Sequence, residues 1–360
     1  MKPDPKIPYN ALPKLPPQEE KYSSVGLWKQ EAAARAAIAE LKGMARIIPN
    51  QSILVNAIAL QEAQDSSEVE NIITTQDDLY RAVSMTGDKN SPHTKEVMNY
   101  REALFTGYSL IHDKGFLTVN DVIMLQEIIV KNNAGVRKMP GTALRNDRTG
   151  EVIYTPPDDK KTIEKLLDNL MIYFNRNDDD SLIKLAISHY QFESIHPFYD
   201  GNGRTGRILN VLYLILKGHL DIPVLYLSRY IIKHKNDYYR LLREVTFNGN
   251  WDEWILYILT GIESTSRETI DKIQNIKLLL DDTIQKVKDT SGNIYSKELV
   301  ELLFENPYCK IEHLVSRLGV ERKAASRYLK NLEEKGILNM LKIGRENIYI
   351  NTELMKLLKV

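Results

Sequence analysis

The stretch "HPFYDGNGRTGR", residues 196–207, decides how the rest of the chain is interpreted. Its twelve positions hold one histidine, one aspartate, one asparagine, two arginines and three glycines, which is too polar and too rich in glycine for a core element. Pro197 favours extended backbone at His196, so we expect the helical pattern before it to stop there. From about Arg204 the sequence becomes apolar at helical spacing, which predicts a second helix that begins inside the motif.

The glycines and arginines of the motif predict an anion site. Gly201 and Gly203 allow backbone angles that other residues avoid, and they let a ligand approach the main chain closely. A glycine loop that opens a helix presents free N–H groups and the positive end of the helix dipole to an anion. Arg204 and Arg207 lie three residues apart, on one face of the first turn. Two guanidiniums beside such amides predict a polyphosphate site.

The aspartate and the histidine add a metal ligand and a base. Asp200 would repel the anion unless a cation lay between them, and one carboxylate plus phosphate oxygens is a common ligand set for Mg²⁺. His196, with an ordinary pKa of about 6.5, can accept a proton from a hydroxyl at neutral pH. Each feature alone has a commoner structural explanation, such as a turn histidine or surface arginines paired with acids. Their coincidence favours attack of a hydroxyl on a nucleotide phosphate.

At every fixed position the stretch matches His-Pro-Phe-x-Asp-Gly-Asn-Gly-Arg-x-x-Arg, the signature of the Fic family, and the resemblance extends over most of residues 10–260. That family transfers AMP from ATP to hydroxyl side chains of proteins and uses Mg²⁺. The resemblance therefore implies a protein adenylyltransferase whose partners are ATP and a protein with an exposed hydroxyl, the chain itself included. In related kinases an alanine stands at the position of Gly201 and a lysine at that of Gly203, so these glycines favour nucleotidyl transfer.

The resemblance assigns roles residue by residue. His196 resembles the general base that acts on the target hydroxyl, and Asp200 resembles the Mg²⁺ ligand. Arg207 resembles the residue that holds the γ-phosphate, and Phe198 resembles a wedge that packs the loop onto the core. The remainder of the motif resembles the nucleotide-binding loop and the first turn of its helix, which here are Gly201, Asn202, Gly203, Arg204, Thr205 and Gly206.

The segment "SSEVEN", residues 66–71, resembles the family's inhibitory pattern Ser/Thr-x-x-x-Glu-Gly/Asn through three residues, Ser66, Glu70 and Asn71. Its place upstream of the glycine motif resembles the second class of the family, whose inhibitory helix, here about residues 57–73, lies in the N-terminal part of the chain. A Glu70 carboxylate paired with Arg207 would take the cation that should hold the γ-phosphate. Taken alone, the segment also fits an ordinary cap at a helix start.

Two further segments resemble parts of the family. A predicted hairpin over 142–157, with a turn at Asn146–Gly150, resembles the flap that aligns a target segment by strand addition, with contacts near Ile153 and Tyr154. The alternative is a surface hairpin without a function. "NDYYRLL" resembles the helix that covers the adenine, with Tyr238 as the base or ribose contact. Thr246 stands where some relatives carry an asparagine.

The fold class predicted is mainly α, with a Fic-type helical bundle that carries a small β-hairpin flap, followed by a winged helix-turn-helix domain. We expect an N-terminal helical region over 1–110, a catalytic core over 111–287 and the winged helix over 288–360, because polar and turn residues gather in "KDTSGNIYS". A helix, a short turn with Gly319, a longer helix and two alternating strands indicate the winged helix.

Composition limits the partners. The 360 residues carry 48 Lys and Arg against 48 Asp and Glu, so overall charge indicates neither a nucleic-acid nor a membrane partner. The single cysteine, Cys309, fits a reducing compartment and is expected to be a small core residue. The proline-rich start is predicted to be an extended leader, not a signal peptide, and no apolar run is long enough to span a membrane. We therefore expect a cytoplasmic protein.

The C-terminal segment 310–346 leaves two interpretations open. It holds nine Lys and Arg against five Asp and Glu, and a basic winged helix can bind DNA. The basic residues expected on or near the recognition helix and wing are Arg322, Lys323, Arg327, Lys330 and Arg345. Winged helices also serve as dimerisation or protein-docking modules. A homodimer that buries the inhibitory segment is a further expectation.

Two functions remain as alternatives to AMP transfer. One is a DNA-binding regulator whose Fic core senses nucleotide with little turnover. The other is removal of AMP from a modified target at the same site, with Glu70 positioning water. The intact His196 and Asp200 favour an enzyme, because a sensor would not need a base.

Overall fold

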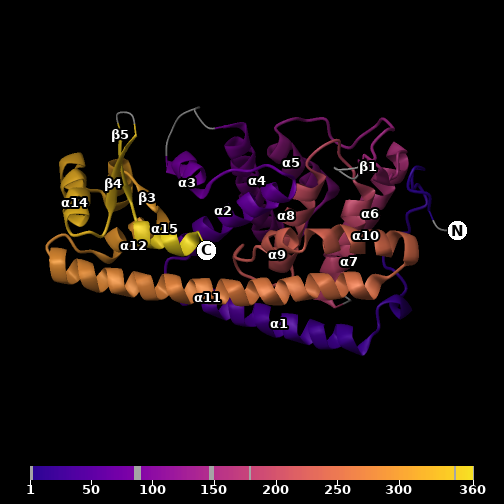
Figure 1. Ribbon diagram of the computed structural model, residues 1–360, viewed down its shortest axis with the longest axis horizontal. Coiled ribbons are helices and arrows are strands. Elements are labelled where there is room, and N and C mark those ends of the chain that lie inside the picture. The colour runs from indigo at the N-terminus through magenta and orange to yellow at the C-terminus, as the bar shows by residue number, and fades with distance from the viewer. Residues whose placement is uncertain (1–2, 85–90, 146–149, 178–179, 344–345, 360) are drawn as a thin grey trace.

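The computed structural model describes residues 3–84, 91–145, 150–177, 180–343 and 346–359, and every structural statement below concerns these residues. The chain is mainly helical, with a small two-stranded hairpin in its first half and three short strands near its C-terminus (Figure 1). The predicted fold class is therefore confirmed.

The helices of the core follow the predicted apolar patterns closely. A short 3-10 helix, Glu19–Lys21, comes first. The α-helices after it, in chain order, are α1 (Val25–Ala45), α2 (Gln51–Val69), α3 (Gln76–Ser84), α4 (Pro92–Lys114), α5 (Val119–Val130), α6 (Lys160–Asn175), α7 (Ser181–Ile195), α8 (Asn202–Leu216), α9 (Leu227–Lys233), α10 (Lys235–Asn248) and α11 (Trp251–Ser291). The short helices α3 and α9 are not expected from the sequence.

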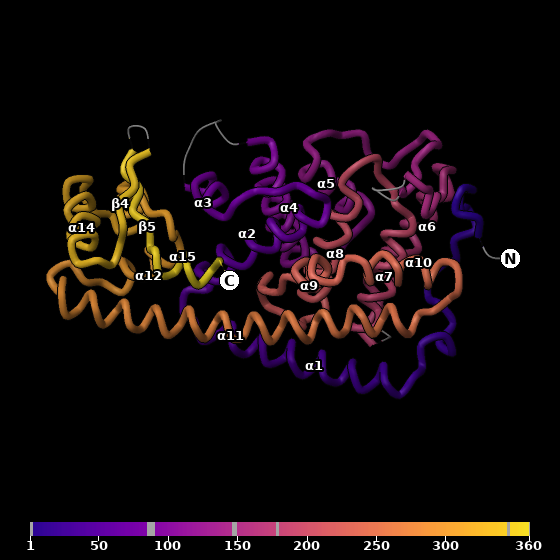
Figure 2. The backbone as a smooth tube through the Cα atoms, viewed as in Figure 1, coloured from indigo at the N-terminus to yellow at the C-terminus, as the bar shows by residue number. Residues whose placement is uncertain are grey.

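The 41-residue helix α11 runs along one side of the whole molecule, and α1 packs beside it (Figures 1 and 2). At about 1.5 Å per residue a helix of this length spans about 60 Å. The buried face of α1 repeats at helical spacing through Ala34, Ala37, Ile38 and Leu41. Helix α11 therefore connects the core to the C-terminal domain, and α1 packs along the part of α11 that lies on the core (Figure 1).

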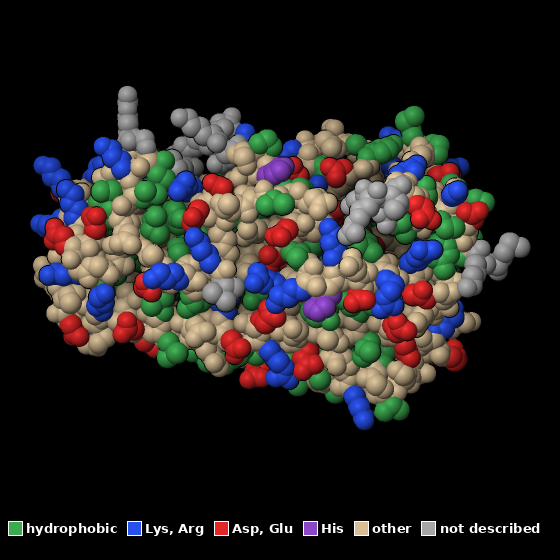
Figure 3. Space-filling model, in the orientation of Figure 1, with side chains coloured by type: hydrophobic (Ala, Val, Ile, Leu, Met, Phe, Trp, Pro, Cys, Tyr) green, Lys and Arg blue, Asp and Glu red, His purple; other side chains and the backbone are tan. Residues whose placement is uncertain are grey.

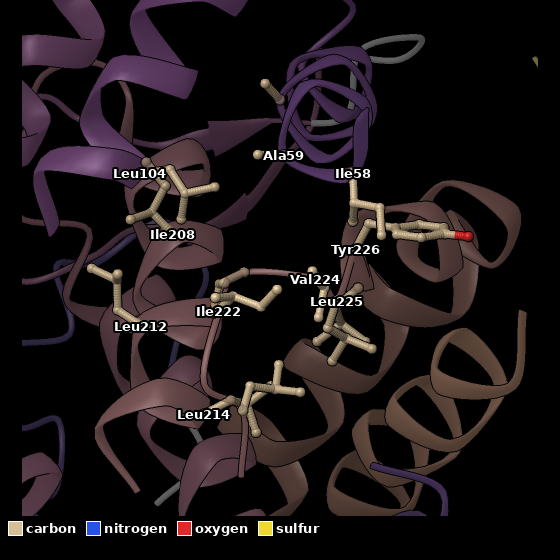
Figure 4. Close-up of a cluster of buried hydrophobic side chains, with 14 of the residues drawn as sticks. Ile58, Ala59, Leu104, Ile208, Leu212, Leu214, Ile222, Val224, Leu225 and Tyr226 are labelled. Atoms are coloured by element: carbon tan, nitrogen blue, oxygen red, sulfur yellow. The ribbon is translucent and has the colours of Figure 1, made fainter. Parts of the chain in front are cut away.

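The helix that follows the glycine motif, α8, lies at the centre of the core and is buried on nearly all sides. Figure 4 shows Ile208 and Leu212 of α8 near Leu104 of α4, with Ile58 of α2 across the same cluster. At Gly107 of α4 a Cβ atom would lie 2.4 Å from Leu212, so the two helices approach as closely as glycine allows. Because α2, α4 and α8 share this cluster, the motif rests on a rigid base.

The hairpin and the N-terminal leader lie together on the core. Strands β1 (Leu144–Arg145) and β2 (Val152–Tyr154) pair antiparallel with an irregular register, and residues 146–149 of the predicted turn lie outside the described part of the chain. The leader is not simply extended as predicted, because it contains tight turns before the 3-10 helix, and its Tyr9 N–H donates to the carbonyl of Thr155 directly after β2 (3.0 Å). The leader is therefore bonded to the chain directly after the hairpin.

The C-terminal domain has the predicted order of helix, turn, helix and wing. Its elements are α12 (Lys297–Glu305), β3 (Tyr308–Cys309), α13 (Ile311–Leu318), α14 (Arg322–Glu334), β4 (Asn339–Ile343), β5 (Glu346–Ile350) and α15 (Thr352–Leu358). The wing pair β4–β5 gains a third strand, β3, on the outer side of β5. The boundary predicted at residue 288 is displaced, because α11 continues without a break to Ser291.

Two sequence expectations about the environment of the chain can be compared with the structure. Cys309 is fully buried in β3, and burial raises the pKa of its thiol to about 12, which makes it an unreactive core residue. Across the described ranges, no helix combines the length and the apolar character needed to cross a bilayer.

The aromatic centre of α11 predicts a large loss of stability on truncation. The fully buried Trp254 donates from its indole Nε1 to the carbonyl of Ala186 (2.8 Å) and stacks on His189. Trp254→Ala should lower the free energy of unfolding by about 3–5 kcal/mol, measured by urea denaturation. Leu278→Ala, at a position of α11 that is 67% exposed, is the matched control and should change it by less than about 1 kcal/mol. Equal effects of the two substitutions would contradict this packing.

Candidate functional site

The glycine motif joins the end of α7 to the start of α8. The helix α7 ends at Ile195, as predicted from Pro197, but His196 takes a left-handed conformation (φ 48°) rather than the extended one expected. Gly201 precedes α8 with φ 78°, and a Cβ there would lie 2.8 Å from Val130 of α5. A side chain is therefore excluded at Gly201 both by its backbone angle and by lack of space.

A buried arginine outside the motif holds the turn at His196. The Arg137 main-chain N–H donates to the carbonyl of Pro197 (2.9 Å), and its Nε donates to the carbonyl of His196 (2.7 Å). Its Nη2 donates to the carbonyls of Ile195 and Pro157. These bonds satisfy main-chain carbonyls that a left-handed turn leaves without helix partners. No local sequence pattern identifies Arg137 in advance.

Two polar side chains of the motif hold the loop rather than face the cavity. The Asn202 amide accepts from the Phe198 N–H and donates to the Phe198 carbonyl, at 2.8 Å each. The Thr205 hydroxyl donates to the carbonyl of Gly201 (2.8 Å). Phe198 is fully buried, in line with its expected role as a wedge. Any anion contact by Asn202 would thus come from its main-chain N–H, whereas the Thr205 N–H already donates to the Gly201 carbonyl (2.9 Å).

Arg204 bridges two carboxylates. Its Nη1 donates to Glu96 Oε2 of α4 (2.9 Å), and its Nη2 lies 3.3 Å from Asp200 Oδ1, which also accepts the Gly201 N–H (2.6 Å). The Arg204 side chain is buried, whereas that of Asp200 is 70% exposed. Glu96 is absent from the sequence prediction, because it lies 108 residues before Arg204 and no spacing links the two.

The predicted pair of Glu70 and Arg207 is present. The Arg207 Nη2 donates to Glu70 Oε1 at 2.8 Å and to the main-chain carbonyl of Ser66 at 2.9 Å. Its Nε donates to the Ser66 hydroxyl at 2.8 Å. Burial acts to raise the pKa of Glu70, but the charge and hydrogen bond of Arg207 outweigh it and hold that pKa below its ordinary value. The carboxylate is therefore ionised and bound to a buried cation.

The inhibitory pattern lies at a helix end, not at a helix start. The helix α2 stops at Val69, and the N–H groups of Asn71 and Ile72 donate to the carbonyls of Glu68 and Ser67, which closes the helix in a Schellman motif. Asn71 takes φ 63°, a conformation that favours glycine or asparagine. The N-cap interpretation of the segment is thus wrong, and the helix that carries most of the segment spans 51–69 rather than the expected 57–73.

Glycine at position 203 makes room for the carboxylate. A Cβ on Gly203 would lie 2.2 Å from Glu70 Oε1 and 2.9 Å from the Arg207 guanidinium. Both distances are shorter than heavy atoms tolerate, so only glycine permits this contact. Glu70 thus lies directly on the first turn of α8, where the sequence predicts the anion.

A cavity of about 850 Å³ opens beside this turn. Its walls come from the end of the inhibitory segment, the hairpin, the end of α7 and the helix α10, through Glu70, Asn71, Leu144, Ile153, Tyr154, Glu193, His196, Gly203, Lys235, Asn236, Tyr239 and Thr246. Both predicted hairpin residues, Ile153 and Tyr154, line it. The volume lies in the range of pockets that enclose a nucleotide-sized ligand.

The predicted base contact, Tyr238, is not on the wall of this cavity. It is 2% exposed, and its hydroxyl pairs with His189 Nε2 inside the core (2.9 Å). The neighbouring Tyr239 is 44% exposed and lines the cavity instead. The sequence "NDYYRLL" does not distinguish the two, because adjacent positions on a helix differ only in which face they occupy.

Burial shifts the pKa values of two titratable side chains at the end of α7, His196 and Glu193. It lowers the pKa of His196 to about 4, and the positive charge of Arg137 acts in the same direction. It raises the pKa of Glu193 to about 7, against the opposing charge of Arg207. Glu193 lies one turn before His196 on the same face, so helical spacing could have identified it. The imidazole is neutral at physiological pH, as a base must be.

Asp200 could provide one carboxylate ligand for a Mg²⁺ that is also bound to phosphate. Contacts to Gly201 and Arg204 engage Asp200 Oδ1, and its exposed side chain remains accessible to a cation. In the part of the chain that the structure describes, no group of three or more His, Cys, Asp or Glu side chains is placed to hold a metal ion. A cation at Asp200 would therefore need ligands from a bound phosphate or from water.

Three family models match the chain in succession. A Fic/DOC family N-terminal model matches residues 28–109, a Fic/DOC family model matches 116–214, and the C-terminal domain model of SoFic-like protein adenylyltransferases matches 279–354. A probable protein adenylyltransferase of Aquifex aeolicus is 27% identical over 175 residues, 47% of each protein. The protein adenylyltransferase Fic of Nematostella vectensis is 34% identical over 80 residues, 22% of this chain and 17% of that protein. The chain thus spans less than half the length of these curated relatives.

Solved structures share the fold. A Fic family protein of Desulfovibrio desulfuricans aligns over 93% of this chain and 98% of its own, with a TM-score of 0.58 and 17% identity. A Fic domain-containing signaling protein of Bacteroides thetaiotaomicron aligns over 66% and 96%, with a TM-score of 0.51 and 18% identity. The motif over 196–207, the three consecutive models and this shared fold show that the chain belongs to the Fic/DOC family and carries a SoFic-like C-terminal domain.

Proposed function

We propose that the chain is a protein adenylyltransferase that moves AMP from ATP to a Tyr, Ser or Thr hydroxyl of a target protein or of itself, and that Glu70 inhibits it. The observation that carries the proposal is the contact of Arg207 with Glu70 beside the cavity that also exposes His196. The curated relatives named as adenylyltransferases support the reaction type. The position of Glu70 supports membership of the class with an N-terminal inhibitory helix.

The nucleotide phosphates would bind at the start of α8. The main-chain N–H groups of Asn202 and Gly203 and the positive end of the helix favour an anion there. Arg204 and Arg207 add two guanidiniums, of which Arg207 would hold the γ-phosphate. Asp200 would hold a Mg²⁺ bound to the phosphates, and that ion would neutralise their charge. Tyr239 replaces Tyr238 as the proposed contact for the base, because it lines the cavity.

Transfer then requires only positioning and one proton acceptor. The hydroxyl oxygen of the target bonds to the α-phosphorus, the bond from that phosphorus to the bridging oxygen of the β-phosphate breaks, and pyrophosphate leaves. The hydroxyl proton passes to the neutral imidazole of His196. Ile153 and Tyr154 of the hairpin would place the target segment through main-chain pairing along β2.

Inhibition follows from competition between two anions for one cation. While Glu70 binds Arg207, its carboxylate occupies the guanidinium that the γ-phosphate would need, and like charges repel. ATP could still enter the cavity, but its α-phosphate would not be aligned for attack. The same geometry suits the alternative reaction, removal of AMP, if Glu70 orients a water molecule. Incubation of the protein with a target that already carries AMP, without ATP, distinguishes the two reactions, because only removal of AMP would release AMP from that target.

Intact-mass analysis with ATP and Mg²⁺ tests the proposal. Glu70→Gly should raise AMP incorporation at least about tenfold, because a hydrogen bond between charged groups contributes about 1.5–3 kcal/mol. His196→Ala in the same background should abolish it. Glu68→Gln, which removes the charge of an exposed carboxylate two residues away and keeps the helix, is the control and should behave as the wild type. Equal labelling of wild type and Glu70→Gly would count against inhibition, and no labelling of either would count against the reaction.

The proton affinity of His196 provides a second test. Because burial lowers its pKa to about 4, the imidazole should stay neutral across pH 5–8, and NMR titration of the wild type should give a midpoint near 4. In the unfolded chain in urea, the His196 imidazole should titrate at about 6.5. The unfolded state therefore binds the proton more tightly, and the free energy of unfolding should decrease as pH falls from 6.5 towards 4. Comparison with His196→Asn assigns the resonance. A midpoint at or above 6.5 in the folded protein would contradict a buried neutral base.

A second proposal concerns the basic face of α14. Lys323, Arg327 and Lys330 are exposed there and line a hollow of about 360 Å³. Figure 3 shows Lys and Arg side chains along the end of the molecule where Figure 1 places α14. Helix α14 is the second helix of the helix-turn-helix, which commonly enters the DNA major groove. Arg345 of the wing lies outside the described residues. We propose that this face binds duplex DNA.

A salt-titrated gel shift tests DNA binding. The double variant Arg327→Ala, Lys330→Ala should bind at least about tenfold more weakly and should reduce the salt slope by roughly 2, one for each lost phosphate contact. Lys356→Ala on α15, an exposed lysine outside this face, is the control and should leave binding unchanged. Absence of a shift at low salt would favour a protein-docking module instead.

A further inference from the structure

A lysine on the wall of the cavity contacts the end of the inhibitory helix. Lys235, the first residue of α10, donates from its ammonium to the main-chain carbonyl of Val69 at 2.6 Å. Val69 is the last residue of α2, directly before Glu70. The last carbonyls of a helix lack partners within it, and a cation placed there is favoured by the helix dipole. Neither the Fic motif nor the inhibitory pattern includes Lys235.

This contact is the last of three polar contacts along one face of α2. Glu62 accepts from the Ser228 hydroxyl (2.5 Å) and from its main-chain N–H (3.3 Å), and Asp65 lies 4.0 Å from the Arg229 guanidinium. Glu62, Asp65 and Val69 are spaced three and four residues apart, so they share a face. That face meets α9 and the start of α10. Of these three contacts, the one made by Lys235 lies at the end of α2, directly before Glu70.

We propose that Lys235 is a positioning residue that holds the end of α2, and with it Glu70, against Arg207. The inference deepens the proposed inhibition and rests on it. Without the ammonium, the Val69 carbonyl loses its bond, and the final turn that carries Glu70 opens more often. Arg207 then spends more time available to the γ-phosphate. Since α10 also lines the cavity through Asn236 and Tyr239, a molecule bound against α10 acts on the same bond.

Epistasis with Glu70 separates this role from a direct role in catalysis. Lys235→Met keeps the length of the side chain and removes its charge. In the otherwise wild-type chain it should raise the initial rate of AMP incorporation roughly fivefold to tenfold, the scale of one lost hydrogen bond to a charged group. In the Glu70→Gly background it should change the rate by less than about twofold. Lys233→Met, which removes an exposed lysine paired with Glu268, is the control and should match the wild type.

Hydrogen exchange provides a readout that does not depend on activity. The N–H groups of Glu70, Asn71 and Ile72 close the end of α2 through bonds to Ser67 and Glu68. In Lys235→Met a peptide covering 66–72 should exchange roughly fivefold faster than in the wild type or Lys233→Met. Unchanged exchange in Lys235→Met overturns the inference, even if no variant incorporates AMP.

The rate measurements can overturn the inference in two further ways. If Lys235→Met matches the wild type while Glu70→Gly is active, Lys235 does not hold the inhibitory contact. If Lys235→Met changes the rate by the same factor with and without Glu70, Lys235 acts on substrate or chemistry instead. Failure of Glu70→Gly to incorporate AMP rejects the proposed function itself, and the exchange measurement then decides on Lys235 alone.

Discussion

A guanidinium buried between α2 and α8 must keep an anionic partner, because an unpaired charge in a protein interior costs several kcal/mol. In this structure Arg207 has that partner in Glu70, together with two further acceptors on Ser66. Any other state of the site has to supply a replacement anion of similar strength, and a terminal phosphate is one. In the proposed function, the Glu70-bound and the nucleotide-bound arrangements are therefore two ways of satisfying the same cation. They cannot both be complete at once.

The rest of the fold holds this cation and its competitors in place. The helix α8 is buried on nearly all sides, so the first turn that carries Gly203 and Arg207 cannot shift without disturbing the core. Arg137 fixes the turn at His196 from the other side through main-chain carbonyls. Glu70, the proposed inhibitory residue, lies by contrast at the end of α2, and its side chain is 37% exposed. A rigid receptor and a terminal, partly exposed inhibitor are what a reversible contact requires.

Local sequence features predicted most of the fold and the centre of the site. Apolar spacing identified the long helices, and the motif predicted that one helix stops before His196 and that another begins within the motif, with Arg207 in its second turn. The short helices α3 and α9 were not predicted, because seven to nine residues contain too few apolar positions to show a helical period. Three further residues near the site were not predicted for another reason: Glu96, Arg137 and Lys235 each come from a part of the chain distant from their partners. Arg137 and Lys235 also bond main-chain carbonyls, which any residue could provide. The sequence prediction named Tyr238 rather than Tyr239 as the base contact. Tertiary packing decides which face of α10 points into the cavity, and residue spacing alone does not show this.

The most direct test of competition for Arg207 is a crystal structure of the Glu70→Gly chain with Mg²⁺ and a non-hydrolysable ATP analogue. The account predicts the terminal phosphate within about 3 Å of the Arg207 guanidinium, with the inner phosphates against the main-chain N–H groups of Asn202 and Gly203. Phosphates bound elsewhere in the cavity, with Arg207 still held by Ser66 alone, would contradict it.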